Sequence, residues 1–138
     1  MTKFIYYVDT DALCTLFRLG NGKFKQLENH NDSLILIGYN YVLVEVSLYK
    51  YLESLSIEGI KFSDAEIIDN QVNSSCKSYV EMYIKHEFSS SEIDNIGVIG
   101  DRIYLMDKQY LFVTHDLKEK LLIKNFKLSF SLGLTDFG

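Results

Sequence analysis

Short apolar runs alternate with segments of helical periodicity along much of the chain. Four runs predict buried strands because they are rich in β-branched and aromatic residues: FIYYV (4–8), LILI (34–37), YLFVT (110–114) and FKLSFSL (126–132). A further short strand is expected within residues 57–68. Apolar residues at helical spacing predict helices that begin near residue 11, span 41–55, 75–88 and 92–108, and follow the strand at 110–114.

Strands that alternate with helices are typical of a parallel sheet covered by helices on both faces. We therefore predict an α/β fold, a three-layer α/β/α sandwich around a mainly parallel sheet of four to five strands. The 138 residues, 47% of them hydrophobic, are enough to bury one core. The sequence has no internal repeat, low-complexity tract or linker. Residues 1–138 are accordingly predicted to form a single domain.

Acidic residues follow two of the clearest strands. Asp9 ends the first strand, and Asp116 follows the run YLFVT. Because the carboxyl ends of parallel strands meet at one edge of a sheet, we expect these carboxylates to lie close together. Glu45 and Asp94 interrupt apolar helical stretches and are expected to join them. Four clustered carboxylates repel one another unless a hard cation such as Mg²⁺ or Mn²⁺ neutralises them.

Each of these acids also has an ordinary structural interpretation. Asp9, Asp94 and Asp116 stand where a carboxylate would cap the following helix or occupy its first turn, and Asp11 is interpreted in this way. Glu45, between two valines, would instead face solvent on a half-exposed helix. The two interpretations stay open for each acid until the fold is known.

The order of these motifs resembles that of the PIN-domain ribonucleases, the toxins of many bacterial toxin–antitoxin pairs. VDTDAL resembles the opening strand of that family with its first acid, and LILIGYNYVLVEVSLYKYL resembles its second strand and following helix. IDNIGVIGD stands where the family presents a third acid, and LFVTHD resembles its terminal Thr-x-Asp motif. The resemblance covers nearly the whole chain.

The resemblance implies a Mg²⁺- or Mn²⁺-dependent endoribonuclease that hydrolyses RNA phosphodiester bonds and is paired with an antitoxin protein. The implied catalytic and metal-binding residues are Asp9, Glu45, Asp94 and Asp116. Asp101 is the substitute for Asp94 as third ligand, because it lies seven residues further along the same expected helix. Thr114 is a candidate hydrogen-bonding group at the site. Positive charge for the RNA substrate is expected from Lys118 and from Lys23, Lys25, Lys120 and Lys124.

Composition limits the other classes of function. The net charge of −5 argues against a protein that coats nucleic acid through a broad basic surface. No apolar run approaches the roughly 20 residues that a membrane span requires, so no membrane association is expected. The N-terminal residues MTKF lead directly into a strand without a signal-peptide pattern, and Cys14 and Cys76 are interpreted as reduced core residues. These features predict a cytoplasmic protein.

Two other functions fit parts of the sequence. A phosphatase of the haloacid dehalogenase type is suggested by the strand-end Asp-x-Asp of VDTDAL and by VIGDRIYLMD (98–107). A catalytically silent binding or immunity protein is suggested by the acidic balance, which suits a partner with a basic surface. The tyrosines of residues 75–88 are interpreted as core or as an oligomer face, so a homodimer is an open alternative.

Overall fold

A computed structural model describes residues 5–9, 16–20, 22–26, 34–38, 41–69, 74–76, 79–88, 100–107 and 110–132 of the chain. These ranges contain thirteen strands and two helices. The chain divides into two compact units, and each is described by itself. Unit 1 comprises residues 1–9, 55–60 and 84–138, and unit 2 comprises residues 10–54 and 61–83.

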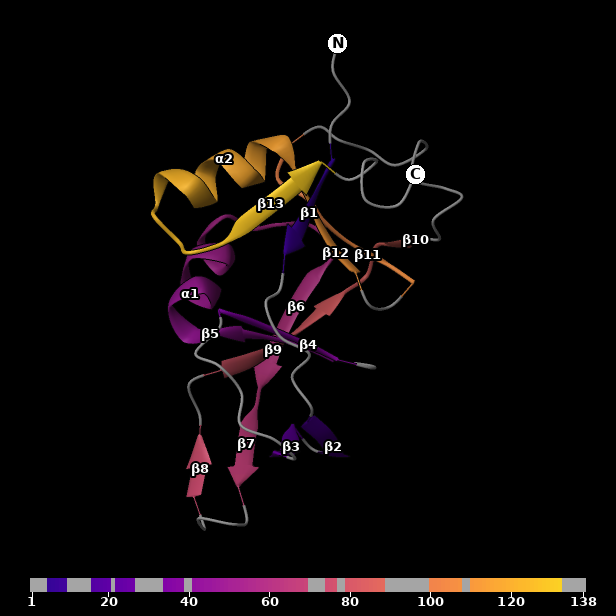
Figure 1. The fold of residues 1–138 in the computed structure, drawn as a ribbon, viewed down its shortest axis with the longest axis vertical. Helices are drawn as coiled ribbons and strands as arrows, with labels where there is room; N and C mark the ends of the chain where they lie inside the picture. Colours follow the sequence, from indigo (N-terminus) through magenta and orange to yellow (C-terminus); the bar gives the residue numbers. More distant parts are fainter. Residues whose placement is uncertain are drawn as a thin grey trace. The chain divides into compact units, whose positions relative to one another are not determined.

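Unit 1 is built on a five-stranded sheet with the order β10-β11-β12-β1-β13. Its elements are β1 (Ile5–Asp9), β10 (Glu87–Phe88), β11 (Ile103–Met106), β12 (Tyr110–Thr114), α2 (His115–Ile123) and β13 (Ser129–Leu132). The central strand β1 is antiparallel to both of its neighbours, β12 and β13. Strands β12 and β13 therefore run in the same direction on either side of β1, and α2 connects them (Figure 1).

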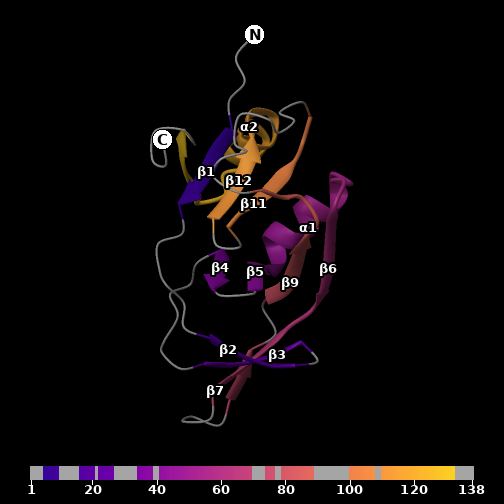
Figure 2. The same cartoon turned by 90° about the vertical axis from the view of Figure 1, so that its right-hand side faces the viewer.

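Helix α2 packs on the sheet of unit 1 through one face. Its buried residues are Leu117 and Leu121, four positions apart, and it contacts β1 and β12 (Figure 2). One cluster of buried side chains in this unit contains Ile5, Phe88, Tyr104, Met106 and Phe112. Burial of these aromatic and aliphatic side chains is the main force that holds the sheet and its flanking segments together.

Unit 2 contains two four-stranded sheets. One has the order β2-β3-β7-β8, and the other has the order β4-β5-β9-β6. The first sheet contains β2 (Leu16–Gly20), β3 (Lys23–Gln26), β7 (Glu66–Asp69) and β8 (Ser74–Cys76). The second contains β4 (Ile35–Gly38), β5 (Tyr41–Glu45), β9 (Tyr79–Ile84) and β6 (Ile60–Asp64), and α1 (Val46–Ser54) directly follows β5.

Both sheets of unit 2 contribute to one buried cluster. Leu16, Phe24 and Ile67 come from the first sheet, and Leu36, Tyr41, Leu43 and Tyr79 come from the second, with Ala65 between β6 and β7. The Tyr41 ring lies edge-on to Phe24 at a centroid distance of 5.4 Å, and its hydroxyl accepts a hydrogen bond from the Leu16 backbone N–H. Unit 2 is therefore two sheets packed over a shared core.

The predicted α/β/α sandwich with a mainly parallel sheet is wrong. The three sheets are mostly antiparallel, and the two parallel pairings with a defined register are β3 with β7 and β10 with β11. The sequence pattern misled because runs of valine, isoleucine and tyrosine fit a buried strand and a buried helix segment equally well. Each of the two helices in the described ranges has nine residues, and neither is long and apolar enough to cross a bilayer.

Some of the strands and helices predicted from the sequence are confirmed, and others are wrong. The strands expected at 4–8, 34–37 and 110–114 and the helix expected after residue 116 are confirmed within one or two residues. The predicted helix at 75–88 is wrong, because this stretch contains β8 and β9. The predicted helix at 41–55 begins only after β5. Of the helix predicted at 92–108, residues 92–99 lie outside the described residues, and Ile103–Met106 is a strand.

Candidate functional site

The strand register of unit 1 separates the two acids that carried the metal-site prediction. Ile5 is paired with Thr114 and Tyr7 with Phe112, so β1 and β12 run in opposite directions. Asp9 lies four residues beyond Ile5 at one end of the pair, and Asp116 follows Thr114 at the other end. At about 3.4 Å per residue, four residues of strand amount to roughly 14 Å. Asp9 and Asp116 therefore cannot share one metal ion across this strand pair.

Each of these two acids has its own local surroundings. The Asp9 carboxylate accepts a hydrogen bond from the Ser131 hydroxyl, at 3.0 Å to one oxygen and 3.3 Å to the other, which links the ends of β1 and β13. Asp116 is exposed in the first turn of α2. A carboxylate in that position interacts favourably with the positive end of the helix dipole.

Thr114 and Asp101 hold the segment that leads into β11. The buried Thr114 hydroxyl donates to the Gly100 carbonyl at 2.7 Å and accepts a hydrogen bond from the Arg102 N–H at 3.1 Å. The Asp101 carboxylate lies 2.5 Å from Lys120 Nζ on α2. The expected hydrogen-bonding group and the substitute third ligand thus connect the residues before β11 to β12 and α2.

Lys118, the expected RNA contact, lies against the sheet. Its ammonium group is 4.2 Å from the centroid of the Tyr6 ring and 3.2 Å from a carboxylate oxygen of Glu119. His115 lies close to the same tyrosine, with ring centroids 5.9 Å apart. These contacts attach the first turns of α2 to β1.

Glu45 lies in unit 2, at the junction of β5 and α1. Its carboxylate accepts hydrogen bonds from the Ser47 backbone N–H at 2.9 Å and from the Ser47 hydroxyl. This is the geometry of an N-cap, in which a side-chain oxygen satisfies one of the first unpaired N–H groups of a helix. The glutamate that was expected as a metal ligand thus starts α1. Asp94 lies outside the described residues.

The described residues do not fit the implied metal centre. Within the ranges that the structure covers, no three His, Cys, Asp or Glu side chains come close enough to hold one ion. The register of β1 and β12 explains why Asp9 and Asp116, the pair on which the prediction depended, do not meet. In a parallel sheet the two strand ends would meet at one edge, whereas antiparallel neighbours place them at opposite edges.

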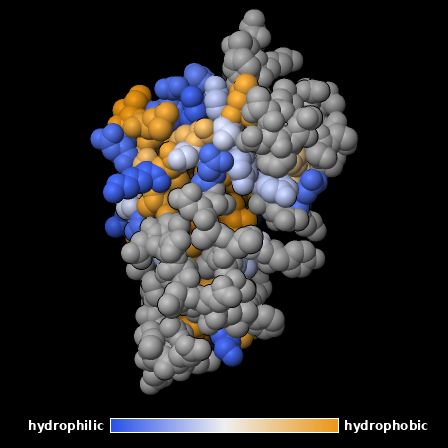
Figure 3. Space-filling view, in the orientation of Figure 1, coloured by the Kyte–Doolittle hydropathy of each residue, from blue (hydrophilic) through white to orange (hydrophobic). Residues whose placement is uncertain are grey.

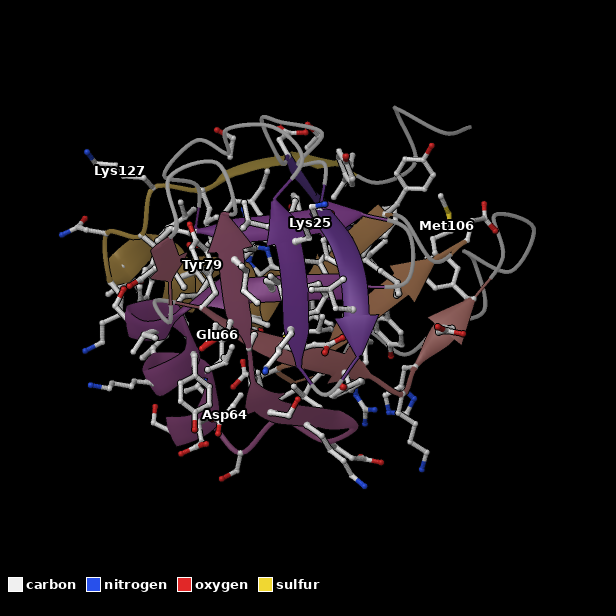
Figure 4. All side chains as sticks on the ribbon, turned by 90° about the horizontal axis from the view of Figure 1, so that it is seen from below. Lys25, Asp64, Glu66, Tyr79, Met106 and Lys127 are labelled. Atoms are coloured by element: carbon white, nitrogen blue, oxygen red, sulfur yellow. The ribbon has the colours of Figure 1, made fainter. Side chains whose placement is uncertain are left out.

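A different group of side chains comes together on α1 and β6 of unit 2. We call it the acidic–aromatic face and define it by Tyr49, Glu53, Phe62 and Asp64. The Tyr49 and Phe62 rings meet edge to face with centroids 4.8 Å apart, and the Tyr49 hydroxyl donates to the Glu53 carboxylate at 2.5 Å. Asp64 lies close to α1 (Figure 4). Glu53 and Asp64 are exposed, and the two rings are half-buried.

The spacing of the residues explains how this face forms. Tyr49 and Glu53 are four positions apart on α1 and so lie one turn apart on the same side of the helix. Phe62 and Asp64 are two positions apart on β6 and share one face of the strand, whereas Lys61 points to the other face. Leu48 and Leu52 anchor α1 by burial.

The acidic–aromatic face has a negative local potential. The hydrogen bond to Glu53, together with desolvation and the charges of Glu53 and Asp64, raises the pKa of the Tyr49 phenol above its usual value of 10.0. Neither carboxylate forms an ion pair with any residue in the described part of the chain. Two negative charges therefore flank a pair of aromatic rings at the surface of unit 2.

Sequence reasoning missed this face and also missed a buried acid in the same unit. Tyr49 and Glu53 both fall in the helix predicted at 41–55, and their spacing of four residues is visible in the sequence. Glu81 on β9 is 1% exposed and accepts a hydrogen bond at 3.0 Å from the hydroxyl of Tyr83, which is 47% exposed. The alternation of YVEMYI was the available signal, because it places Glu81 and Tyr79 on one face of a strand.

Comparison of the chain with protein-family models, with curated proteins and with solved structures finds no match. The PIN-domain resemblance thus stays a prediction from short motifs, and the fold that it implied is contradicted by the antiparallel sheets.

Proposed function

We propose that the protein is a binding protein for a protein partner with a basic surface, the role of an inhibitor or immunity protein. The observation that carries this proposal is the acidic–aromatic face. Two carboxylates and two half-buried rings gather there on adjacent elements of one unit. Unit 2 contains nine acidic and six basic residues, so its net charge is also negative.

The composition of this face resembles that of energetically important regions in protein interfaces. Aromatic side chains, tyrosine in particular, carry much of the binding energy in such interfaces because they bury large surfaces with few rotatable bonds. The edge-to-face contact and the hydrogen bond to Glu53 restrict the Tyr49 ring before binding. This restriction lowers the entropy that a complex would lose.

The carboxylates favour a positively charged partner in two ways. Their field accelerates the encounter with a basic surface, and a lysine or arginine placed over the rings can interact with both the π-face and a carboxylate. Hydrolysis by paired Asp9 and Asp116 is not proposed, because the register of β1 and β12 places them at opposite ends of the strand pair.

The test measures binding of a synthetic amphipathic lysine–leucine peptide by calorimetry. A glutamate–leucine peptide of the same length serves as the control ligand. We expect the lysine peptide to bind and the glutamate peptide not to bind. The double variant Glu53→Gln/Asp64→Asn should bind the lysine peptide at least about tenfold more weakly, since two charge-assisted contacts are lost.

The matched control is Asp9→Asn/Asp116→Asn, which removes the same number of negative charges from unit 1. This variant should bind the lysine peptide with unchanged affinity. If both double variants bound the lysine peptide equally weakly, the affinity would depend on net charge alone, which would contradict the proposal. Mn²⁺-stimulated RNA cleavage that Asp9→Asn or Asp116→Asn abolishes would replace the proposal with a nuclease.

A further inference from the structure

The last turn of α2 presents apolar side chains to solvent. Ile123 is 76% exposed and Leu122 is 42% exposed, and Lys124 and Lys127 are exposed directly after them. We call these four residues the basic–apolar end. Figure 3 shows a hydrophobic area at this end of the helix with hydrophilic residues around it, and Figure 4 shows Lys127 pointing away from the ribbon. Contiguous apolar surface on a protein can serve as an interaction site.

The charge of this region is opposite to that of the whole chain. Residues 117–132 contain four lysines and one glutamate, although the chain as a whole has a net charge of −5. Lys118 lies over Tyr6 and Lys120 pairs with Asp101, so both point toward other elements of unit 1. Lys124 and Lys127 flank the exposed Ile123, so positive charge and apolar surface coincide at this end of α2.

We propose that the basic–apolar end of one copy of the protein docks on the acidic–aromatic face of a second copy. The two surfaces are complementary in both respects that matter: aliphatic side chains meet aromatic rings, and two lysines meet two carboxylates. The inference rests on the proposed function, because it assigns a ligand to the same face.

This contact joins two different surfaces, so it is heterologous and leaves one unused surface of each kind on a pair of copies. Self-association therefore increases with protein concentration and competes with a basic partner for the acidic–aromatic face. A contact of this composition also weakens with salt, since exposed charges are screened within about 8 Å at physiological ionic strength.

Sedimentation velocity of the full chain tests the proposal with two charge-reversal variants. The first, Lys124→Glu/Lys127→Glu, loses the docking end and keeps the receptor face. The second, Glu53→Lys/Asp64→Lys, loses the receptor face and keeps the docking end. We expect the wild type to associate at about 50 mM NaCl and to dissociate at about 500 mM. Each variant alone should be monomeric, and an equal mixture should associate again, because each variant supplies one intact surface.

Restored association in the mixture cannot result from misfolding of either variant, since each supplies one intact surface. The variant Ile123→Ser should weaken wild-type association about tenfold through its apolar contact alone. The control Lys85→Glu reverses one charge at a lysine of unit 1 that is not part of the docking end, and this variant should associate as the wild type does. A monomeric wild type at low salt, or a mixture that stays monomeric, would overturn the inference.

Binding of the lysine–leucine peptide distinguishes a failure of this inference from a failure of the proposed function. Peptide binding that depends on Glu53 and Asp64, without self-association, overturns the inference and leaves the proposed function standing. Self-association that survives Glu53→Lys/Asp64→Lys overturns the inference too, because it uses another surface.

Discussion

The acidic residues of the two units have different surroundings. In unit 1, three of them stabilise local structure at separate positions: Asp9 accepts a hydrogen bond from Ser131, Asp101 pairs with Lys120, and Asp116 occupies the first turn of α2. On the acidic–aromatic face of unit 2, Glu53 and Asp64 converge on one tyrosine and form no ion pair with the described residues. The same residue types therefore serve stability in one region and leave charge available for binding in the other.

The difference shows why position along the chain is a weak guide to an acidic site. Asp9 and Asp116 each follow a buried strand, which favoured a shared metal, but the direction of the strands decides whether such residues meet. Glu53 does not follow a strand, so the sequence pattern did not indicate it as a site residue. Its role becomes visible only when Tyr49 on α1 and Phe62 on β6 are seen in contact.

The largest expected effect on stability comes from a variant that removes the hydrogen bonds of Thr114 in unit 1. The variant Thr114→Val keeps the shape of the side chain but leaves the Gly100 carbonyl and the Arg102 N–H without their partner. Loss of two hydrogen bonds at a buried position should lower the free energy of unfolding by about 2 to 4 kcal/mol. Urea denaturation measures the change, and Thr114→Ser, which retains the hydroxyl, is the control. A loss below that of Thr114→Ser would contradict the assignment.

A smaller effect is expected at the start of α1. The variant Glu45→Ala removes the N-cap of the helix that carries Tyr49 and Glu53, and should cost about 1 kcal/mol in urea denaturation. Glu45→Asp keeps a carboxylate at this position and should recover part of the loss. No destabilisation by Glu45→Ala would show that the capping interaction is unimportant.

Removal of the hydrogen bond between Ser131 and Asp9 should have a still smaller effect on stability. Ser131→Ala should lower the free energy of unfolding by about 0.5 to 1 kcal/mol, because the bond is only partly buried. Asp9→Asn retains an oxygen acceptor and should cost less. A rise in Tm on addition of Mn²⁺ to the wild type that Asp9→Asn abolishes would instead assign Asp9 to a metal site.

The smallest effect concerns the titration of Tyr49. Glu53→Gln replaces the charged acceptor that most raises the pKa of this phenol with a neutral amide oxygen, so that pKa should fall toward 10.0. A phenol whose pKa is raised on folding contributes stability below its unfolded pKa of about 10 and loses that contribution as the pH rises through the folded pKa. Ultraviolet absorbance titration of wild type and Glu53→Gln, with Tyr49→Phe to identify the signal, measures the shift. Identical titration curves would show that the Glu53 carboxylate does not raise the pKa of Tyr49.

Parts of the fold were predictable from local patterns. The strand at 110–114 combines β-branched and aromatic residues with buried surroundings, and the helix after it begins where an acidic residue enters a first turn. Strand direction was not predictable, because pairing depends on contacts far apart in sequence. Ser129–Leu132 pairs with the opposite end of the chain, and no local signal specifies that partner.

The candidate site was less accessible to sequence reasoning than the fold. Tyr49 and Glu53 are one helical turn apart, so their contact could have been inferred once the limits of α1 were known. The proximity of Phe62 and Asp64 requires the packing of α1 on β6, which no spacing rule provides. Asp9 and Asp116 were expected to meet because the alternation of strands and helices predicted a parallel sheet, in which the ends of both strands would lie at one edge.

The most direct test of the binding role follows the amide NMR signals of the whole chain during titration with the lysine–leucine peptide. The account predicts that saturable shifts concentrate on α1 and β6, around Tyr49, Glu53 and Phe62, and that the signals of β1 stay unchanged. Shifts that concentrate on β1 and the first turn of α2, around Asp9 and Asp116, would contradict it.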